Sequence, residues 1–459
     1  MKTAESSPVS LNNLRDGPET SLEEGLERAR RLISDRSGII TDVQFTELTP
    51  EEPAVYWAQT RPADVSASCG QPALNLGSAA SVDPNRAVMK AVGESVERYC
   101  SAQYNRDEFQ LSAFEKLDAE AVPPQSFALF SETQHADPEF PFSPMNELTP
   151  LRWVEGFSLT HDKPVFVPAT FVYVPYEMEP HGESKVHFPI STGLACAPNL
   201  VSAIYKGILE VVERDAFMIT WQNRISPVRL NLWSSDDPFV NRLLNLIKRV
   251  PVQCSAFVLT LDINIPFVMV VLQSTTDRPP YTIIGIGIDL DPTRAIVLAL
   301  EEAYFSYVGM NRYIKKQSDF KPEPGYRNVK TPIEHGFAHA VWPELRKSSE
   351  FLFKSDKELS VEDLPNKFNQ SMVTNVKYLV KLLQEKGLNA VIVDLTTPDI
   401  NEVGFKVIRA VVPGLQPLDV SHEYRYLGGR RLYAVPYESG LHQKPLTERE
   451  LNSDPHLFP

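Results

Sequence analysis

Gly77-Ser-Ala-Ala-Ser-Val-Asp83 opens a stretch that closes with Glu94-Ser-Val-Glu97-Arg98, and its pattern occurs three times in the chain. In each copy a Gly is followed six residues later by Asp or Asn, ten later by Ala and seventeen later by Glu. The copies are Gly77…Asp83…Ala87…Glu94, Gly193…Asn199…Ala203…Glu210 and Gly285…Asp291…Ala295…Glu302. Their irregular spacing does not suit a solenoid, so we predict three related units inside one larger fold.

Each unit is predicted to be a strand, a turn and a helix. An apolar run precedes each Gly, at residues 72–76, 186–190 and 281–284, and is typical of a strand. The Gly permits a turn or a close approach of two backbones. The Asp or Asn then stands where a helix N-cap belongs. Together with further alternation of strands and helices, this predicts a mixed α/β fold.

The first two helices carry charged residues in matching places. Helical spacing puts the Lys and both Glu residues of each on one face: Lys90, Glu94 and Glu97, then Lys206, Glu210 and Glu213. A solvated face is the ordinary explanation. Recurrence on two mostly apolar helices instead favours a cation between them, because close, buried carboxylates repel. Since Mg2+ prefers oxygen ligands and usually brings a phosphate, the residues alone predict a magnesium–nucleotide site.

Two stretches resemble the nucleotide-binding motifs of YcaO proteins: residues 90–100, from Lys90 to Cys100, and residues 206–216, from Lys206 to Ala216. Supporting stretches lie at residues 191–195, 393–399, 412–417, 429–432 and 455–459. The resemblance covers about residues 61–459. It is strongest to the discrete YcaO cyclodehydratases of thiazole/oxazole-modified peptide pathways, and it implies a YcaO-type fold with the three units around a nucleotide site.

The resemblance implies roles for individual residues and two cofactors, ATP and Mg2+. Glu94, Glu97, Glu210 and Glu213 match the glutamates that hold Mg2+ and the phosphates. The residues implied to bind the nucleotide are Lys90, Glu94, Glu97, Lys206, Glu210, Glu213, Arg214 and Glu302. The third helix departs from the family, because Phe305 and Tyr307 stand where many members have Gln and Arg. Those contacts are therefore lost or supplied elsewhere, for example by Arg312 or Arg431.

The implied activity is ATP-dependent cyclodehydration of a ribosomal precursor peptide. A Cys, Ser or Thr side chain attacks the preceding carbonyl, ATP phosphorylates the amide oxygen, and loss of phosphate leaves an azoline ring. Two alternatives stay open: backbone thioamide or amidine formation, and a non-catalytic nucleotide-binding subunit of a maturase complex. The peptide, the preferred ring and the oligomeric state are not specified by the sequence.

The resemblance also suggests partners and a role for the last residues. A ubiquitin-activating-like partner is expected to bind the leader peptide, because too little sequence precedes Gly77 to hold such a domain. A homodimer is expected, and a flavin dehydrogenase partner is left open. The end, Pro455-His-Leu-Phe-Pro459, resembles the proline-rich C-termini that reach into azoline-forming sites. Pro459 is therefore expected to act in catalysis through its free carboxylate.

Bulk properties set the remaining expectations. The net charge of -14 argues against nucleic-acid binding, and no apolar run is long enough for a membrane span. Four cysteines without a CxxC pair fit a reducing compartment, so we expect a cytoplasmic protein. His335 and His339 are spaced for a helical metal site, but a structural role is favoured. Residues 1–60 are expected to form a partly disordered segment with one helix, 61–440 the catalytic domain and 441–459 a tail.

Overall fold

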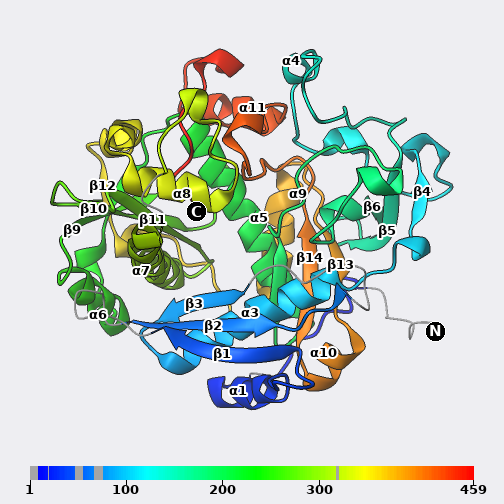
Figure 1. Ribbon diagram of the computed structural model, residues 1–459, viewed down its shortest axis with the longest axis horizontal. Helices are drawn as coiled ribbons and strands as arrows, with labels where there is room; N and C mark the ends of the chain where they lie inside the picture. Colours follow the sequence, from blue (N-terminus) through cyan, green and yellow to red (C-terminus); the bar gives the residue numbers. More distant parts are fainter. Residues whose placement is uncertain (1–8, 19, 47–54, 67–75, 317–319) are drawn as a thin grey trace.

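The computed structural model describes residues 9–18, 20–46, 55–66, 76–316 and 320–459. Its strands form three sheets (Figure 1). The first is antiparallel, in the order β1 (Ile40–Thr46), β2 (Tyr56–Pro62), β3 (Gly77–Ser81). The second runs β11 (Thr282–Ile288), β10 (Phe267–Ser274), β9 (Val252–Val258), β8 (Val228–Asn231), β12 (Glu358–Ser360). The third runs β4 (Gln110–Ser112), β5 (Leu151–Ser158), β13 (Val391–Asp394), β14 (Lys406–Val411), β7 (Leu194–Ala197), and β6 (Lys163–Pro168) pairs with β5.

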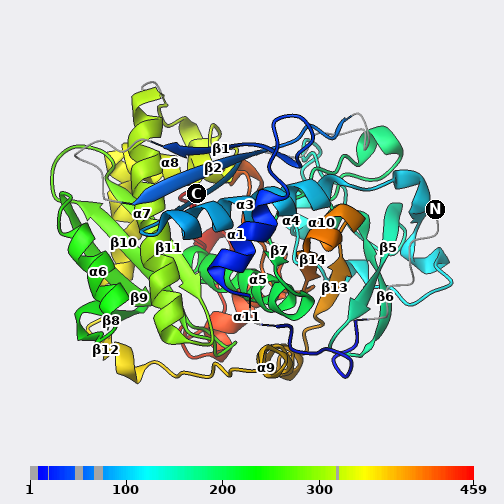
Figure 2. The ribbon, with the colours of Figure 1, turned by 90° about the horizontal axis from the view of Figure 1, so that it is seen from below.

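The helices cover these sheets and the space between them (Figures 1 and 2). They are α1 (Leu22–Arg30), α3 (Pro84–Ala102), α4 (Glu132–His135), α5 (Leu200–Gln222), α6 (Pro238–Ile247), α7 (Pro292–Lys316), α8 (Pro332–Val341), α9 (Met372–Glu385), α10 (Pro398–Val403) and α11 (Arg430–Glu438). The mixed helix-and-sheet fold expected from the sequence is thereby confirmed. Among the helices described, none has both the length and the apolar character needed to cross a bilayer.

Each repeat in the sequence is one strand followed by one helix, and each pair belongs to a different sheet. The pairs are β3 with α3, β7 with α5, and β11 with α7. The predicted N-caps are correct: Asp83 accepts from the backbone of Asn85 and Arg86, Asn199 from Ser202, and Asp291 from Thr293 at 2.9 Å. A side-chain acceptor at this position satisfies a backbone donor that the helix leaves free.

The predicted position of the strand was wrong in the second unit. Residues 186–190 form no strand; Gly193 has a φ of 90° and β7 follows directly. In the first unit most of the predicted run, residues 72–75, lies outside the described part of the chain, and β3 begins at Gly77. The third run is a strand as predicted from Thr282 onward, and Gly285 lies inside the same strand, β11. Apolar content alone could not separate a buried loop from a buried strand.

The glycines act mainly by letting a strand touch the backbone of its own helix. A Cβ on Gly77 would lie 2.2 Å from the Ala91 carbonyl oxygen, and one on Gly285 would lie 2.1 Å from the Ala303 nitrogen. A Cβ on Gly193 would instead meet the Ala410 oxygen of β14 at 2.3 Å. The predicted close backbone approach is therefore confirmed, and at Gly77 and Gly285 it draws α3 and α7 tightly onto their strands.

Apolar residues of these strands and helices form the core. The largest cluster surrounds α5 and packs it between the second and third sheets and α9. A second cluster joins the third sheet to α3, and a third joins α7 and α6 to the second sheet. α1 begins with the capping box Ser21–Glu24 and is the one helix expected in the N-terminal segment. This core fixes α3, α5 and α7 relative to one another.

Substituting Gly285 with Ala should destabilise the protein by about 3 kcal/mol or more, because the new Cβ overlaps helix backbone that cannot move aside like a side chain. Gly93→Ala is the matched control. Gly93 lies inside α3 with nothing within 4 Å of a Cβ, so this change should stabilise by about 0.5–1 kcal/mol. Urea unfolding of both variants measures the difference, and similar stabilities would contradict the close-approach role of Gly285.

Candidate functional site

The three repeat units exchange contacts in a cycle at the middle of the molecule. Besides its own strand, α3 contacts β7, α5 contacts β11, and α7 contacts β3. Figures 1 and 2 show α3, α5 and α7 arranged around the middle of the molecule. Because Glu94, Glu210 and Glu302 occupy the same place in each unit, this cycle brings the predicted carboxylates of all three helices to one region.

The first Glu of each unit accepts a hydrogen bond from the backbone of the strand that precedes it. Glu94 accepts from the Ser78 N–H at 2.9 Å, Glu210 from Gly193 at 3.0 Å, and Glu302 from Ile286 at 2.6 Å. The repeated spacing from Gly to Glu thus places each Glu where it links its helix to the preceding strand or turn by a hydrogen bond. These bonds hold the three carboxylates in fixed orientations.

In the first two units an arginine one turn later binds the same carboxylate. Arg98 Nη2 lies 3.2 Å from Glu94, and Arg214 Nη2 lies 3.5 Å from Glu210. Both pairs are partly exposed, at 17% and 33% and at 16% and 28% of their side-chain areas. Arg98 and Arg214 therefore form equivalent ion pairs within their own helices.

Glu97, Glu213 and Glu302 are buried where the surrounding protein compensates a negative charge poorly. Burial raises the pKa of Glu97 to about 8; the charges of Glu210 and Glu94 add to the rise, while Arg98 and the Cys196 N–H, a hydrogen-bond donor at 2.7 Å, oppose it. Burial and the charge of Glu302 raise the pKa of Glu213 well above its usual value. Burial raises the pKa of Glu302 to about 7. A bound cation would relieve this repulsion.

Arg409 on β14 faces the same region and was missed in the sequence. Its side chain is 5% exposed, and Nη2 donates to the Ile190 carbonyl at 2.8 Å. Burial lowers its pKa to about 10, although the charge of Glu210 favours the ion. Within the described chain, its Nε and Nη1 have no hydrogen-bond partner. An Arg inside the otherwise apolar run of residues 407–412 was the signal that could have revealed it.

Lys90 lies among these groups but binds an unexpected partner. Its Nζ lies 2.5 Å from Glu301 of α7, not beside Glu94 in its own helix. Glu301 is 4% exposed and also accepts from the Ser81 hydroxyl at 2.7 Å. Lys206, at the same place in the second unit, is exposed and lies 3.5 Å from the Cys196 carbonyl. The two lysines therefore differ in environment despite their matching positions.

The donor set fits a magnesium–phosphate group, although it is not a ready-made chelate. In the described part of the chain, no three acidic, Cys or His side chains form a group that could hold a metal ion. In Glu94, Glu97 and Glu210, one carboxylate oxygen accepts a hydrogen bond from a backbone N–H. Mg2+ commonly takes one or two carboxylates and completes its shell with water and phosphate oxygens. The unpartnered Arg409 donors suit the oxygens of such an anion.

The family departure on α7 is explained by packing. Phe305 meets Trp57 of β2 edge to face, with ring centroids 5.3 Å apart, and Tyr307 is buried in the core. Of the two suggested substitutes, Arg431 makes four hydrogen bonds to Asp215 and Asp262. Arg312 lies over the ring of Trp57, at 5.4 Å. Arg409 instead keeps two buried donors, Nε and Nη1, that have no hydrogen-bond partner among the described residues, and the charge of Glu210 acts on it.

The last five residues are part of the core beside this site. Phe458 is 4% exposed and stacks on Arg214, whose guanidinium carbon lies 4.0 Å from the ring centroid. His335 and His339 have the structural role expected of them. The His335 ring stacks on His456 at 3.7 Å, and His339 hydrogen-bonds the Pro455 carbonyl at 2.7 Å. Figure 1 shows this terminal segment running into the centre of the molecule.

Comparisons with known proteins agree with this geometry. A protein of Methanothermobacter thermautotrophicus, described as uncharacterized, is 28% identical over 68% of this chain and 79% of its own length. A solved heterocyclase in complex with substrate and cofactor has a TM-score of 0.82 and 24% identity, covering 98% of this chain. YcaO from Methanopyrus kandleri, solved with AMPPCP and Mg2+, has a TM-score of 0.63 and 20% identity, covering 86% of this chain and 91% of its own. This chain spans 59% of the heterocyclase chain.

The chain belongs to the YcaO family. The family model, described as YcaO cyclodehydratase, ATP- and Mg2+-binding, matches residues 68–416. The solved structures support the same fold. The resemblance inferred from residues 90–100 and 206–216 is thus confirmed, and the expected cofactors are those of the family's description.

The Lys90–Glu301 pair predicts a specific pattern of stabilities. Lys90→Ala should cost about 2–3 kcal/mol, because it leaves a buried carboxylate unpaired, while Lys90→Ala combined with Glu301→Gln should recover most of this loss. Thermal unfolding of the single and double variants measures this. Nucleotide affinity of the double variant separates the two roles: unchanged affinity means that Lys90 is structural, and weakened affinity supports a phosphate contact.

Proposed function

We propose that this protein is an ATP-dependent cyclodehydratase that converts Cys, Ser or Thr residues of a ribosomal precursor peptide into azolines. The observation that carries the proposal is the convergence of Glu94, Glu97, Glu210, Glu213 and Glu302, with Arg214 and Arg409, in a chain of the YcaO family. Such a set of charges is of use where phosphate charge must be held and redistributed.

The proposed division of labour follows the contacts. Glu94, Glu97, Glu210 and Glu213 would hold Mg2+, and the same four with Lys90, Lys206, Arg214 and Glu302 would hold the nucleotide. Magnesium–ATP supplies the phosphoryl group that turns an amide oxygen into a leaving group. Arg214 and Arg409 would neutralise the oxyanion formed when the substrate side chain attacks the preceding carbonyl. Arg409 suits this role because its buried Nε and Nη1 lack partners among the described residues.

The proposal includes partners. The precursor peptide is the substrate, and a separate ubiquitin-activating-like protein is proposed to bind its leader. Binding the leader remotely would raise the local concentration of the core peptide at the carboxylate cluster.

The decisive test is reconstitution with a precursor peptide, its leader-binding protein, ATP and Mg2+, followed by mass measurement. We expect ATP turnover that depends on the peptide, with loss of one water per ring. Exchange of oxygen for sulfur would instead indicate thioamide formation, and nucleotide binding without turnover would indicate a non-catalytic subunit. Either result would contradict the proposed activity.

Within this assay, Glu94→Gln, Glu97→Gln, Glu210→Gln and Glu213→Gln should each lower turnover about 100-fold or more, because each removes charge from the magnesium and phosphate site. Gln keeps an acceptor for the strand N–H, so folding should be retained. Glu27→Gln, on the exposed face of α1, is the matched control. Near-normal turnover in two or more of the four variants would refute the assignment.

We also propose that Pro459 acts in catalysis. The stacking of Phe458 on Arg214, and the packing of Pro459 against Gly336, bring this residue beside the carboxylate cluster. Deleting residues 455–459 would remove core packing as well, since Leu457 and Phe458 are buried. A variant lengthened by one Gly after Pro459 leaves that packing intact but displaces the carboxylate.

This lengthened variant should lose about tenfold or more in ring formation while nucleotide affinity and melting temperature stay close to wild type. The matched control replaces Glu448, which lies outside the buried segment, with Gln. Ring formation at the wild-type rate by the lengthened protein would remove Pro459 from the catalytic residues.

A further inference from the structure

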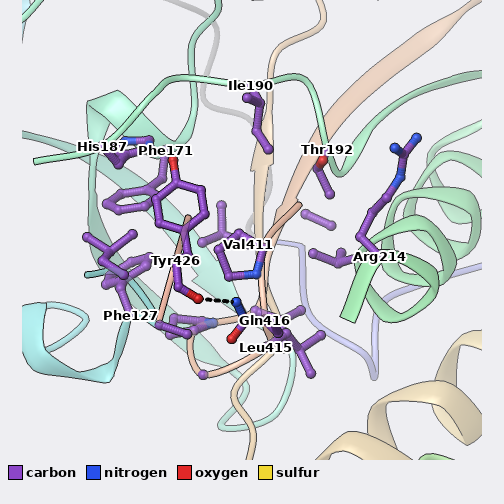
Figure 3. A pocket seen from close by; sticks show the side chains of 18 of the residues that line it. Phe127, Phe171, His187, Ile190, Thr192, Arg214, Val411, Leu415, Gln416 and Tyr426 are labelled. Atoms are coloured by element: carbon purple, nitrogen blue, oxygen red, sulfur yellow. Dashed lines mark hydrogen bonds between the residues drawn. The ribbon is translucent and has the colours of Figure 1, made fainter. Parts of the chain in front are cut away.

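An aromatic pocket adjoins the carboxylate cluster and has no role in the functions discussed above. Figure 3 shows it between the segment around Phe127, the turn at Phe171, residues 187–192 and the chain that follows β14. We call it the aromatic pocket and define it by six apolar residues: Phe127, Phe171, Phe188, Ile190, Val411 and Tyr426. Its lining is mostly apolar, in contrast to the charged region beside it.

Ring stacking and hydrogen bonds hold the apolar walls of the aromatic pocket in place. Phe171 stacks between Phe127 and His187, with ring centroids 4.0 Å away on either side. His187 hydrogen-bonds the Thr170 hydroxyl at 2.9 Å, and burial lowers the pKa of this imidazole to about 3, so it is neutral at physiological pH. On the opposite side, the Tyr426 hydroxyl accepts from the Phe188 N–H at 3.1 Å. Rings fixed in this way suit a flat or bulky apolar group.

Two arginines connect the pocket to the carboxylate cluster. Arg214 and Arg409 line the aromatic pocket and also interact with Glu210, the former at 3.5 Å and the latter through its charge. The Nε and Nη1 groups of Arg409 are buried and, in the described chain, have no hydrogen-bond partner. Buried donors without partners are costly, so a ligand oxygen at this end of the pocket would be stabilised. The preferred ligand is therefore apolar with an oxygen at one end.

The geometry of a peptide matches this division. In the proposed reaction the attacked carbonyl belongs to the residue that precedes the cyclised Cys, Ser or Thr, and its side chain is attached one carbon from that carbonyl. A carbonyl oxygen held by Arg409 would thus place this side chain next to the arginines, where the aromatic pocket opens. We propose that the aromatic pocket receives the side chain of the residue immediately before the cyclised one, and selects large apolar side chains there. The inference rests on the proposed function.

The test is a panel of precursor peptides that differ only at the residue before one cyclised Cys, with Phe, Leu, Gly or Asp in that place. The full chain is assayed with the leader-binding partner, ATP and Mg2+, and kcat/KM for ring formation is measured by mass. We expect Phe and Leu to exceed Gly and Asp about tenfold or more, as for other apolar pockets. Equal values across the panel would overturn the inference alone. No ring from any peptide would overturn the proposed function and the inference together.

Two variants locate the preference in the aromatic pocket. Val411→Phe fills the pocket. It should lower kcat/KM for the Phe and Leu peptides about tenfold, which removes their advantage, and leave kcat/KM for the Gly peptide unchanged. Phe127→Ala, at a partly exposed position, enlarges the pocket and should narrow the difference in kcat/KM between the Phe and Gly peptides. It is the second variant to use if Val411→Phe does not fold. Leu298→Phe, on an exposed face of α7, is the control for added bulk. A higher KM for ATP with every peptide, and an unchanged preference, would assign the pocket to the nucleotide base and overturn the inference.

Discussion

The main constraint on the structure is the repulsion among carboxylates that are buried where α3, α5 and α7 converge. Five glutamates from three helices converge there, and burial with mutual repulsion raises the pKa of Glu97, Glu213 and Glu302. A fold tolerates such repulsion only if packing elsewhere fixes the helices in place. The glycine contacts that draw α3 and α7 onto their strands, and the apolar clusters around the three helices, supply that constraint.

The three strand–helix units hold their buried glutamates with different local contacts. All three use a Glu to accept a strand N–H, yet the arginine that follows is present in only two units. In the third, Glu301 and Lys90 form a pair between helices, and Phe305 packs against Trp57. The third unit thus contributes mainly to cohesion between sheets. Asymmetry of this kind leaves α7 with one carboxylate of the cluster, Glu302, while α3, α5 and β14 supply its other charged groups.

Sequence reasoning could reach the parts of the site that follow from spacing along one helix. The repeated Glu positions, the N-caps and the close approach at the glycines all follow from local periodicity, and all are present in the structure. Arg409 and Glu301 could not be found in this way, because their relevance arises from contacts across the fold. The run at residues 186–190 was assigned to a strand because buried loops and buried strands share an apolar composition.

The contacts that build the site join residues far apart in the sequence, and this affects how the protein folds. Lys90 and Glu301 are 211 residues apart in sequence, and Glu97 and Cys196 are 99 apart. Contacts of such long range form late and slowly, after much chain entropy has been lost. No partly folded fragment can therefore present the assembled carboxylate cluster. A ligand of that cluster would act as a reporter of completed folding, since it can stabilise only molecules in which all three helices have docked.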